Sequence, residues 1–422
     1  MPYVAPENYR PLSPETIGDY LKEIPEVTAI LGNDSASWTA EEVGDGNLNL
    51  VFIVKAGEKS VIAKQALPYV RLVGESWPLP LSRAYFEYEA LAREEAVVPG
   101  LTPKIIKYDH EMALIVMEHL TPHIILRKGL IAGTIYPYLA AHMGNFMAQT
   151  LFRYSDLALS GEEKKLNVAL FSENHVMCGL TEQVIFDDPY FEAELNRHTS
   201  PQLDAVAEDI KNDAALKVGI QELKTLFMTK TQTLLHGDLH SGSIMVTEED
   251  TRVIDPEFAF YGPMGFDIGA LMANLLLAFF SQSGHETKTG DRDESREFII
   301  STLLASWAVF EAEFSSLWRT ERTGSLYPKT LFLEDDTGAE ERALNAYLRD
   351  VMVDSIGFTG AKMLRRILGI AHVEDLESIE DADVRAECEK KALTLGRILI
   401  TERENISSFD DVVRMAEAIE RG

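Results

Sequence analysis

The spacing of apolar and polar positions divides the chain into a strand-rich first part and a helical second part. Up to about residue 120, short apolar runs alternate with turn residues, as in half-buried strands joined by turns. Beyond Pro122 the apolar residues recur at helical spacing. We expect strands at 51–54, 60–64, 105–106 and 113–117, and helices at 83–96, 136–154, 213–230, 267–280, 296–314, 339–353 and 384–402.

This order of elements predicts an α+β fold made of two lobes. Residues 1–120 would form a small β-rich lobe, and residues 121–422 a large, mostly helical lobe. A short crossover at 117–121 would join the two. No internal repeat and no low-complexity linker interrupts the sequence, so both lobes are expected to form one catalytic unit.

Composition and charge narrow the class of protein further. With 46% hydrophobic and 25% charged residues, the 422-residue chain is typical of a globular protein with a sizeable core. The net charge of −29 repels nucleic acid and anionic membranes, so neither is expected as a main partner. The most apolar run, 268–280, is shorter than a membrane span of ~20 residues and is predicted to be a buried helix. Two cysteines and no signal peptide predict a reducing, cytoplasmic location.

The segment HGDLHSGS at 236–243 concentrates two His, two Gly and one acid. Two predicted strands, 244–247 and 252–254, follow it as a hairpin that ends at Asp255. Because a hairpin brings its ends together, Asp238 and Asp255 should lie close in space. In kinase-type phosphotransferases one acid faces the attacking hydroxyl and another holds magnesium, so we expect Asp238 to orient and deprotonate a hydroxyl. The alternative is a loop Asp with nearby helix caps.

Two carboxylates, Asp255 and Glu257, offer the hard oxygen ligands that Mg²⁺ prefers. In an extended segment, residues separated by one position point to the same side, so both could bind one ion. The alternative is an ordinary turn, with Pro256 fixing φ. Asp267 precedes the apolar helix and has two structural interpretations: it caps that helix, or its carboxylate holds the backbone of the 236–243 loop.

Nucleotide phosphates would bind in the first part of the chain. Glycines between strands let backbone N–H groups approach a phosphate, and Asn tolerates the left-handed conformation. Lys64 ends an apolar strand, where a Lys can pair with phosphates and with a helix Glu, Glu87 first and Glu89 second. The alternatives are a hairpin turn and a solvated strand end. The contacts expected in the glycine-rich stretch are Gly44, Asp45, Gly46, Asn47 and Asn49.

Two further features have open interpretations. Lys362, Arg365 and Arg366 lie near the end of a helical segment. Consecutive arginines diverge by about 100° on a helix, so both reach one phosphate only at a helix end or a bend. Otherwise the segment is a solvated helix end near its own dipole. Trp77 lies in the loop GESWPLP at 74–80 and is either a lid over a ligand or a packed loop residue.

These residues together resemble the protein-kinase-like, aminoglycoside phosphotransferase-type superfamily, and within it the methylthioribose kinase family. The narrower resemblance rests on GDGNLN at 44–49, the 236–243 loop, RRILGIAH at 365–372 and the tryptophan loop RLVGESWP at 71–78, so it covers nearly the whole chain. Most kinases of the wider group place a metal-binding Asn five residues after the catalytic Asp, where this chain has Ser243. The Asp-x-Glu at 255–257 is in a position to compensate, as it is in methylthioribose kinases.

The resemblance implies a two-lobed, protein-kinase-like fold whose first lobe binds the nucleotide. It implies ATP and Mg²⁺ as cofactors and 5-methylthioribose as the small-molecule substrate, phosphorylated at its anomeric hydroxyl by a homodimer in methionine salvage. Arg365 and Arg366 would stabilise charge on the transferring phosphate, and Trp77 would close near the sugar. Glu118 and Leu120, in the crossover, would offer backbone groups to adenine.

Two rival functions stay open. The chain could phosphorylate another small hydroxyl compound, of the aminoglycoside, choline or homoserine kind, although the arginine pair and Ser243 favour the narrower family. It could also be a nucleotide-binding pseudokinase with a scaffold role. The presence of Lys64, Asp238, Asp255 and Glu257 argues against that second rival.

Overall fold

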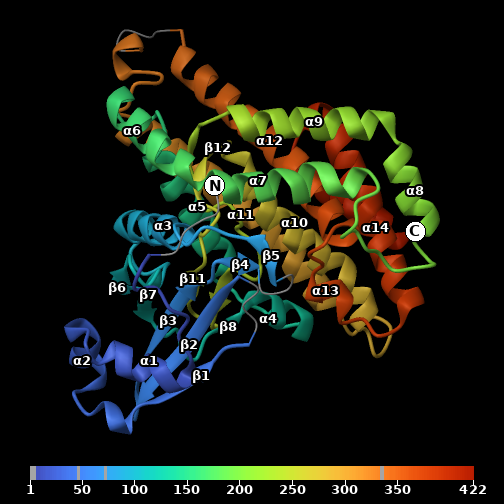
Figure 1. Ribbon diagram of the computed structural model, residues 1–422. Coiled ribbons are helices and arrows are strands. Elements are labelled where there is room, and N and C mark those ends of the chain that lie inside the picture. Colours follow the sequence, from blue (N-terminus) through green and yellow to red (C-terminus); the bar gives the residue numbers. More distant parts are fainter. Residues whose placement is uncertain (1–5, 45–47, 71–73, 333–336) are drawn as a thin grey trace.

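The computed structural model describes the whole chain except residues 1–5, 45–47, 71–73 and 333–336. It has the predicted α+β fold of two lobes. Figure 1 shows a smaller lobe around a sheet, in blue shades, and a larger lobe built mostly of helices, in green to red.

The smaller lobe is built on an antiparallel sheet of order β1-β2-β3-β7-β6. Phe52 and Val54 of β2 are fully buried on the same side as Val61 and Ala63 of β3, as their alternation predicts. A tight turn closes this hairpin, and its Gly57 has a φ of +60°, which favours glycine. The strands are β1 (Thr39–Glu42), β2 (Asn49–Ala56), β3 (Lys59–Ala66), β6 (Ile105–Asp109) and β7 (Leu114–Glu118), with β4 (Tyr69–Val70) and β5 (Gly74–Pro78) as a separate pair.

The described part of this lobe contains three α-helices. α3 (Arg83–Val97) matches the helix predicted at 83–96 and packs against the sheet. α1 (Pro14–Leu21) and α2 (Pro25–Leu31) precede the first strand and were not predicted. They are short, and their apolar residues reach the core only because the sheet lies beneath them. The lobe is therefore less purely β than its sequence suggests.

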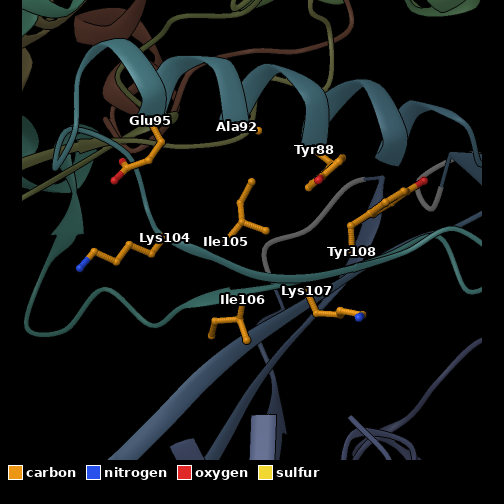
Figure 2. Close-up of a pocket in the computed structure, with 8 residues that line it drawn as sticks. All are labelled: Tyr88, Ala92, Glu95, Lys104, Ile105, Ile106, Lys107 and Tyr108. Carbon is orange, nitrogen blue, oxygen red and sulfur yellow. The ribbon is translucent and has the colours of Figure 1, made fainter. Parts of the chain in front are cut away.

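A cavity of about 580 Å³ lies between α3 and β6. Figure 2 shows the side chains of Tyr88 and Glu95 on the helix above those of the β6 strand. The rings of Tyr88 and Tyr108 stack with their centroids 4.7 Å apart. The residues that line this cavity include none of those predicted for catalysis or ATP binding. They are Tyr88, Ala92, Glu95, Lys104, Ile105, Ile106, Lys107 and Tyr108.

The larger lobe is centred on α10, which is buried along its whole length. The helices α11, α12 and α14 pack against α10 and match predicted helices. α12 continues past residue 353, where the sequence predicted that it ends. A Cβ added to Gly360 of α12 would lie 2.4 Å from the carbonyl oxygen of Gly396 in α14, so these glycines permit close helix packing rather than ending a helix. The elements are α5 (Leu139–Arg153), α10 (Gly265–Ser281), α11 (Asp293–Glu321), α12 (Ala339–Leu368) and α14 (Ala382–Thr401).

Shorter elements complete this lobe. The predicted hairpin after the 236–243 loop is confirmed as β10 and β11, and β8 pairs with β10. Apart from the predicted α9, most short helices were not expected, since few residues give a weak periodic signal. The elements are α4 (Leu126–Ala132), α6 (Gly161–Phe171), α7 (His175–Thr181), α8 (Asp204–Asn212), α9 (Ala214–Thr229), α13 (Glu374–Glu377), α15 (Phe409–Arg421), β8 (Ile124–Ile125), β9 (Thr233–Leu235), β10 (Ile244–Val246), β11 (Thr251–Val253) and β12 (Phe260–Gly262).

By length and composition alone, the helical segments Gly265–His285 and Asp293–Glu321 could cross a membrane. The apolar window of the first is completely buried inside the lobe, and 44% of the window of the second is buried. Core helices of globular proteins pass the same test, so this is weak evidence for a span. The prediction that 268–280 is a buried helix is confirmed.

Candidate active site

The 236–243 loop is held by a buried carboxylate beneath it. Asp267 accepts hydrogen bonds from the backbone N–H groups of His236, over 2.7 Å, and Gly237, over 3.0 Å. Asp267 lies inside α10, after Met264 at the N-cap, so the interpretation of Asp267 as the helix cap is wrong and the loop-holding one is confirmed. The burial of this carboxylate raises its pKa, and the contacts with the loop oppose that rise.

Gly237 has a structural reason to be glycine. Its φ is +85°, in the left-handed region, and a Cβ there would lie 2.2 Å from the carbonyl oxygen of Phe258. The loop therefore passes directly beside the segment that follows Glu257. His236 Nε2 also lies 2.9 Å from the carbonyl oxygen of Ile254. The 236–243 loop therefore contacts the segment of Asp255 and Glu257 at two points, one just before Asp255 and one just after Glu257.

Asp238 is surrounded by cations. Lys362 Nζ lies 3.1 Å from Asp238 Oδ1, and the guanidinium groups of Arg365 and Arg366 each lie 3.9 Å from one carboxylate oxygen. His240 Nε2 lies 3.3 Å from Asp238 Oδ2. Burial alone would raise the pKa of Asp238, but Lys362, His240 and Arg366 outweigh it and hold the pKa well below its usual range. Asp238 is therefore an oriented carboxylate rather than a strong base.

The three basic residues in the last two turns of α12 all point inward. Lys362, Arg365 and Arg366 are 2%, 6% and 7% exposed, so the interpretation of a solvated helix end is wrong. Their spacing of three and four positions places them on one helix face, and α12 ends against the 236–243 loop. Burial lowers the pKa of each of them. The Nε atoms of both arginines are buried without a hydrogen-bond partner among the described residues, which leaves donors for an anion.

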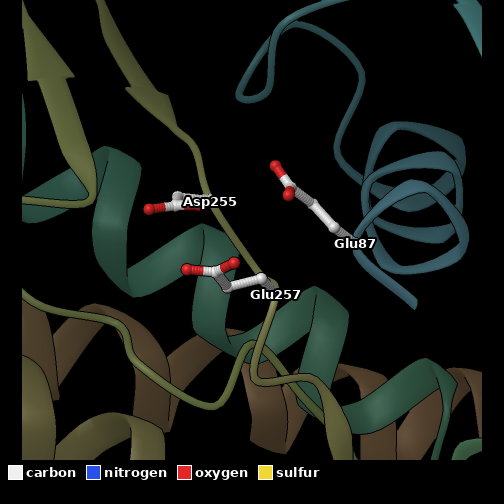
Figure 3. A group of neighbouring side chains, drawn as sticks. All are labelled: Glu87, Asp255 and Glu257. Atoms are coloured by element: carbon white, nitrogen blue, oxygen red, sulfur yellow. The ribbon is translucent and has the colours of Figure 1, made fainter. Parts of the chain in front are cut away.

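A second cluster holds three carboxylates. Glu87, Asp255 and Glu257 each have an oxygen within 4.8 Å of the others. Figure 3 shows Glu87 on a helix, facing Asp255 and Glu257 on one loop segment. The segment is not extended as predicted, because Asp255 has a φ of +72°. Lys64 Nζ lies 2.8 Å from Glu87 Oε1 and also donates a hydrogen bond to Asp255. The preferred partner, Glu87, is confirmed over Glu89, which pairs with Arg93.

The charges of this cluster do not balance. Three carboxylates face the cations Lys64 and Arg83, whose Nε lies 3.4 Å from Glu257. Burial and the nearby carboxylates raise the pKa of Glu87 to about 8, and burial with Asp255 raises the pKa of Glu257. A divalent cation would relieve this repulsion, and carboxylate oxygens are ligands that Mg²⁺ prefers. The residues present therefore fit a magnesium ion, and Asp255 and Glu257 stay its predicted ligands.

The predicted ATP contacts have different fates. Gly44 follows β1, whereas Asp45, Gly46 and Asn47 lie outside the described residues. Asn49 is buried, and its side-chain amide donates to Glu257 over 3.0 Å while its oxygen accepts from Arg83 over 3.1 Å. Asn49 thus supports the segment that carries Glu257, and its contact with ATP stays a prediction.

The crossover lies between the sheet and the helical lobe. Glu118 ends β7 and its carboxylate accepts a hydrogen bond from the backbone N–H of Lys104. The Leu120 side chain is buried, and the chain continues into β8, which pairs with the hairpin of the larger lobe. This position suits a contact with adenine, which stays a prediction for both residues.

Trp77 lies at the end of β5 and is half-buried. It packs against the buried pair formed by Leu79 and by Met177 of α7, and so do Leu48 and Phe258. This cluster brings Trp77 together with the end of the glycine-rich stretch, α7 and the segment after Glu257. The position suits a lid on an apolar part of a ligand. That role stays a prediction.

Ser243 supports the catalytic loop. Its hydroxyl donates a hydrogen bond to the backbone carbonyl oxygen of Asp238 over 3.0 Å. Sequence reasoning missed Arg83, and it named Lys362 beside the arginines without giving it a role in the site. The signal for Lys362 was its spacing to the arginines on one helix face. Arg83 carried no such signal, because a helix-starting Arg is ordinarily exposed.

Residues 39–298 match the phosphotransferase enzyme family. Over the full length, the chain is 47% identical to methylthioribose kinase 1 of Oryza sativa subsp. japonica, covering 98% of this chain and 97% of that protein. It is 44% identical to the methylthioribose kinase of Escherichia coli O45:K1 (strain S88 / ExPEC), covering 98% of both chains. A solved glucosamine kinase structure (crystal form A) has a TM-score of 0.48 at 14% identity, covering 91% of this chain and 83% of that one.

Proposed function

The chain belongs to the methylthioribose kinase family, and we propose that it phosphorylates 5-methylthioribose with ATP at the anomeric hydroxyl, giving the 1-phosphate for methionine salvage. The observation that carries the site assignment is the position of Asp238. It lies beside three buried cations, on a loop that is pinned by Asp267 and contacts the residues on either side of Asp255 and Glu257. That combination serves the transfer of a phosphoryl group better than it serves simple nucleotide binding.

Asp238 orients the anomeric hydroxyl and accepts its proton. The hydroxyl oxygen forms a bond to the γ-phosphorus as the bond from that phosphorus to the β,γ-bridging oxygen breaks, and ADP leaves. Phosphoryl transfer depends on positioning more than on a strong base, so the low pKa of Asp238 is compatible with this role. Arg365 and Arg366 donate to the oxygens of the transferring group, where charge-assisted hydrogen bonds are strong.

Lys64, held by Glu87, and the backbone near Gly44 bind the ATP phosphates. Asp255 and Glu257 would hold Mg²⁺, which neutralises charge on the phosphates when it is bound. Arg83 and Asn49 keep Glu257 in place for this task. The neutral sugar would be bound through its hydroxyls, with Trp77 over the methylthio end.

The test measures ATP consumption by the purified protein with and without methylthioribose. We expect turnover that depends on methylthioribose and a 1-phosphate product, identified by ³¹P NMR. Turnover with choline or an aminoglycoside but not with the sugar would support the first rival. ATP binding without any turnover would support the pseudokinase.

We also propose that the enzyme is a homodimer and works in the cytoplasm, as the family resemblance implies. The dimer is tested by light scattering coupled to size-exclusion chromatography, where a mass near twice 47.1 kDa is expected. A mass of a single chain at micromolar concentration would exclude a stable dimer.

A further inference from the structure

Lys362 makes the shortest contact between a basic side chain and Asp238 among the described residues. Its Nζ lies 3.1 Å from Oδ1, whereas both arginines are 3.9 Å away. The same ammonium group lies 4.2 Å from the centroid of the Phe266 ring. Phe266 directly precedes Asp267, which holds the loop backbone. Lys362 is therefore placed by the same part of α10 that positions the catalytic loop.

The two oxygens of Asp238 are held from different sides. The backbone N–H of Gly242 donates to His240 Nδ1 over 2.9 Å, so in neutral His240 the proton is on Nε2. That Nε2–H points to Asp238 Oδ2, while Lys362 occupies Oδ1. A carboxylate held at both oxygens cannot rotate freely, yet each oxygen keeps a lone pair for a substrate hydroxyl.

We propose that Lys362 is a positioning residue of the reaction, whose ammonium group fixes the ionised Asp238 carboxylate in the orientation that receives the hydroxyl proton. This inference rests on the proposed kinase function. The proton moves from the sugar hydroxyl to Asp238, and Lys362 keeps its own proton throughout. Its positive charge then disfavours protonated Asp238, so the proton passes on to solvent when the products leave.

The surroundings of Lys362 give this role a pH dependence. Asp238 faces Lys362 from the loop, and His240 lies on the other oxygen of that carboxylate. Arg365 and Arg366 of α12 lie near Lys362, as do Phe266 and Asp267 of α10. Arg127 adds positive charge at the arginines. Burial and the two arginines lower the pKa of Lys362 to about 8, and Asp238 opposes them. The ammonium form that holds Asp238 is present below that pH and is lost above it. Activity should therefore fall as the pH rises through about 8.

The experiment compares Lys362→Met and Lys362→Arg with the wild type, measuring kcat, the KM for ATP and the pH profile. Losing a charged hydrogen bond predicts a kcat about 10- to 100-fold lower in Lys362→Met, with the KM for ATP changed less than about threefold. Lys362→Arg should keep more activity, and its alkaline limb should move above pH 10 because arginine stays protonated.

The matched control is Lys230→Met, which removes a lysine whose Nζ lies 2.6 Å from Asp354, also on α12. Its kcat should stay within about twofold of the wild type. If Lys362→Arg does not fold, Lys362→Ala should regain kcat when propylamine is added, with a rate that follows the protonated amine. The inference is overturned if Lys362→Met keeps its kcat within about threefold, or if the alkaline limb is the same in Lys362→Arg and wild type, or if propylamine restores nothing. A wild type without turnover on methylthioribose would instead refute the proposed function.

Discussion

Asn49 donates a hydrogen bond to Glu257 over 3.0 Å, although the two residues are 208 positions apart. Asn49 begins β2 of the sheet, whereas Glu257 follows the hairpin of the helical lobe. Arg83 of α3 joins them, because it donates to Asn49 and lies beside Glu257. The predicted metal ligand is thus held by side chains of the other lobe, so the metal site forms only when both lobes are in place.

Glu257→Gln should raise the Mg²⁺ concentration needed for half-maximal activity by about tenfold or more, because it removes one charged ligand while keeping the shape. The measurement is the initial rate against Mg²⁺ at saturating ATP and sugar. Glu41→Gln, which removes an exposed partner of Lys55, is the control and should leave the curve unchanged. An unchanged Mg²⁺ curve in Glu257→Gln would remove Glu257 from the metal site.

Asp238→Asn should lower kcat by roughly two or more orders of magnitude, since the amide cannot accept the hydroxyl proton. Circular dichroism should show that the variant still folds, because the amide keeps the size of the carboxylate. Thermal unfolding should begin at a lower temperature, because three buried cations lose their counter-charge. The surface variant Asp209→Asn is the control, as Asp209 forms an exposed ion pair with Arg397. Turnover near the wild-type rate in Asp238→Asn would contradict the assignment.

Asp267→Ala should lower the free energy of unfolding by about 2 to 6 kcal/mol, because two buried backbone N–H groups lose their acceptor. Asp267→Asn should lose less, since its amide oxygen still accepts one bond. Urea unfolding followed by fluorescence measures both values. A loss below about 1 kcal/mol in the alanine variant would mean that the loop does not depend on this carboxylate.

His240 should make the wild type less stable in mild acid. Burial lowers its pKa from 6.5 to about 4 although Asp238 opposes the shift, so the unfolded chain binds a proton that the folded chain does not. Stability should fall as the pH decreases from 6.5 to about 4, by up to about 1.4 kcal/mol per pH unit from this group. His240→Asn should show a shallower decline in urea unfolding across that range. Equal slopes would show that His240 does not titrate this way.

Much of the fold was predictable because its long elements have strong periodic patterns. The β2–β3 hairpin, α3 and the β10–β11 hairpin all lie where the apolar spacing placed them. The helices α1 and α2 were missed because short helices are stabilised mainly by what they pack against. The predicted end of α12 was wrong for a related reason. Glycine weakens an exposed helix, but in α12 Gly360 allows close contact with α14.

Local sequence was enough to point to the groups that we propose for the chemistry of the site: Asp238, Asp255, Glu257 and the Lys64–Glu87 pair. Their roles follow from residue type and short spacing, and a hairpin needs only nearby residues to bring two acids together. The direction of Lys362 and the two arginines, and the support of Glu257 by Arg83 and Asn49, depend on how α12 crosses α10 and how the lobes meet. Those contacts join residues more than 100 positions apart, and no local pattern specifies them. Burial of this many charges is favourable only where opposite charges converge, and that convergence exists only in the folded chain.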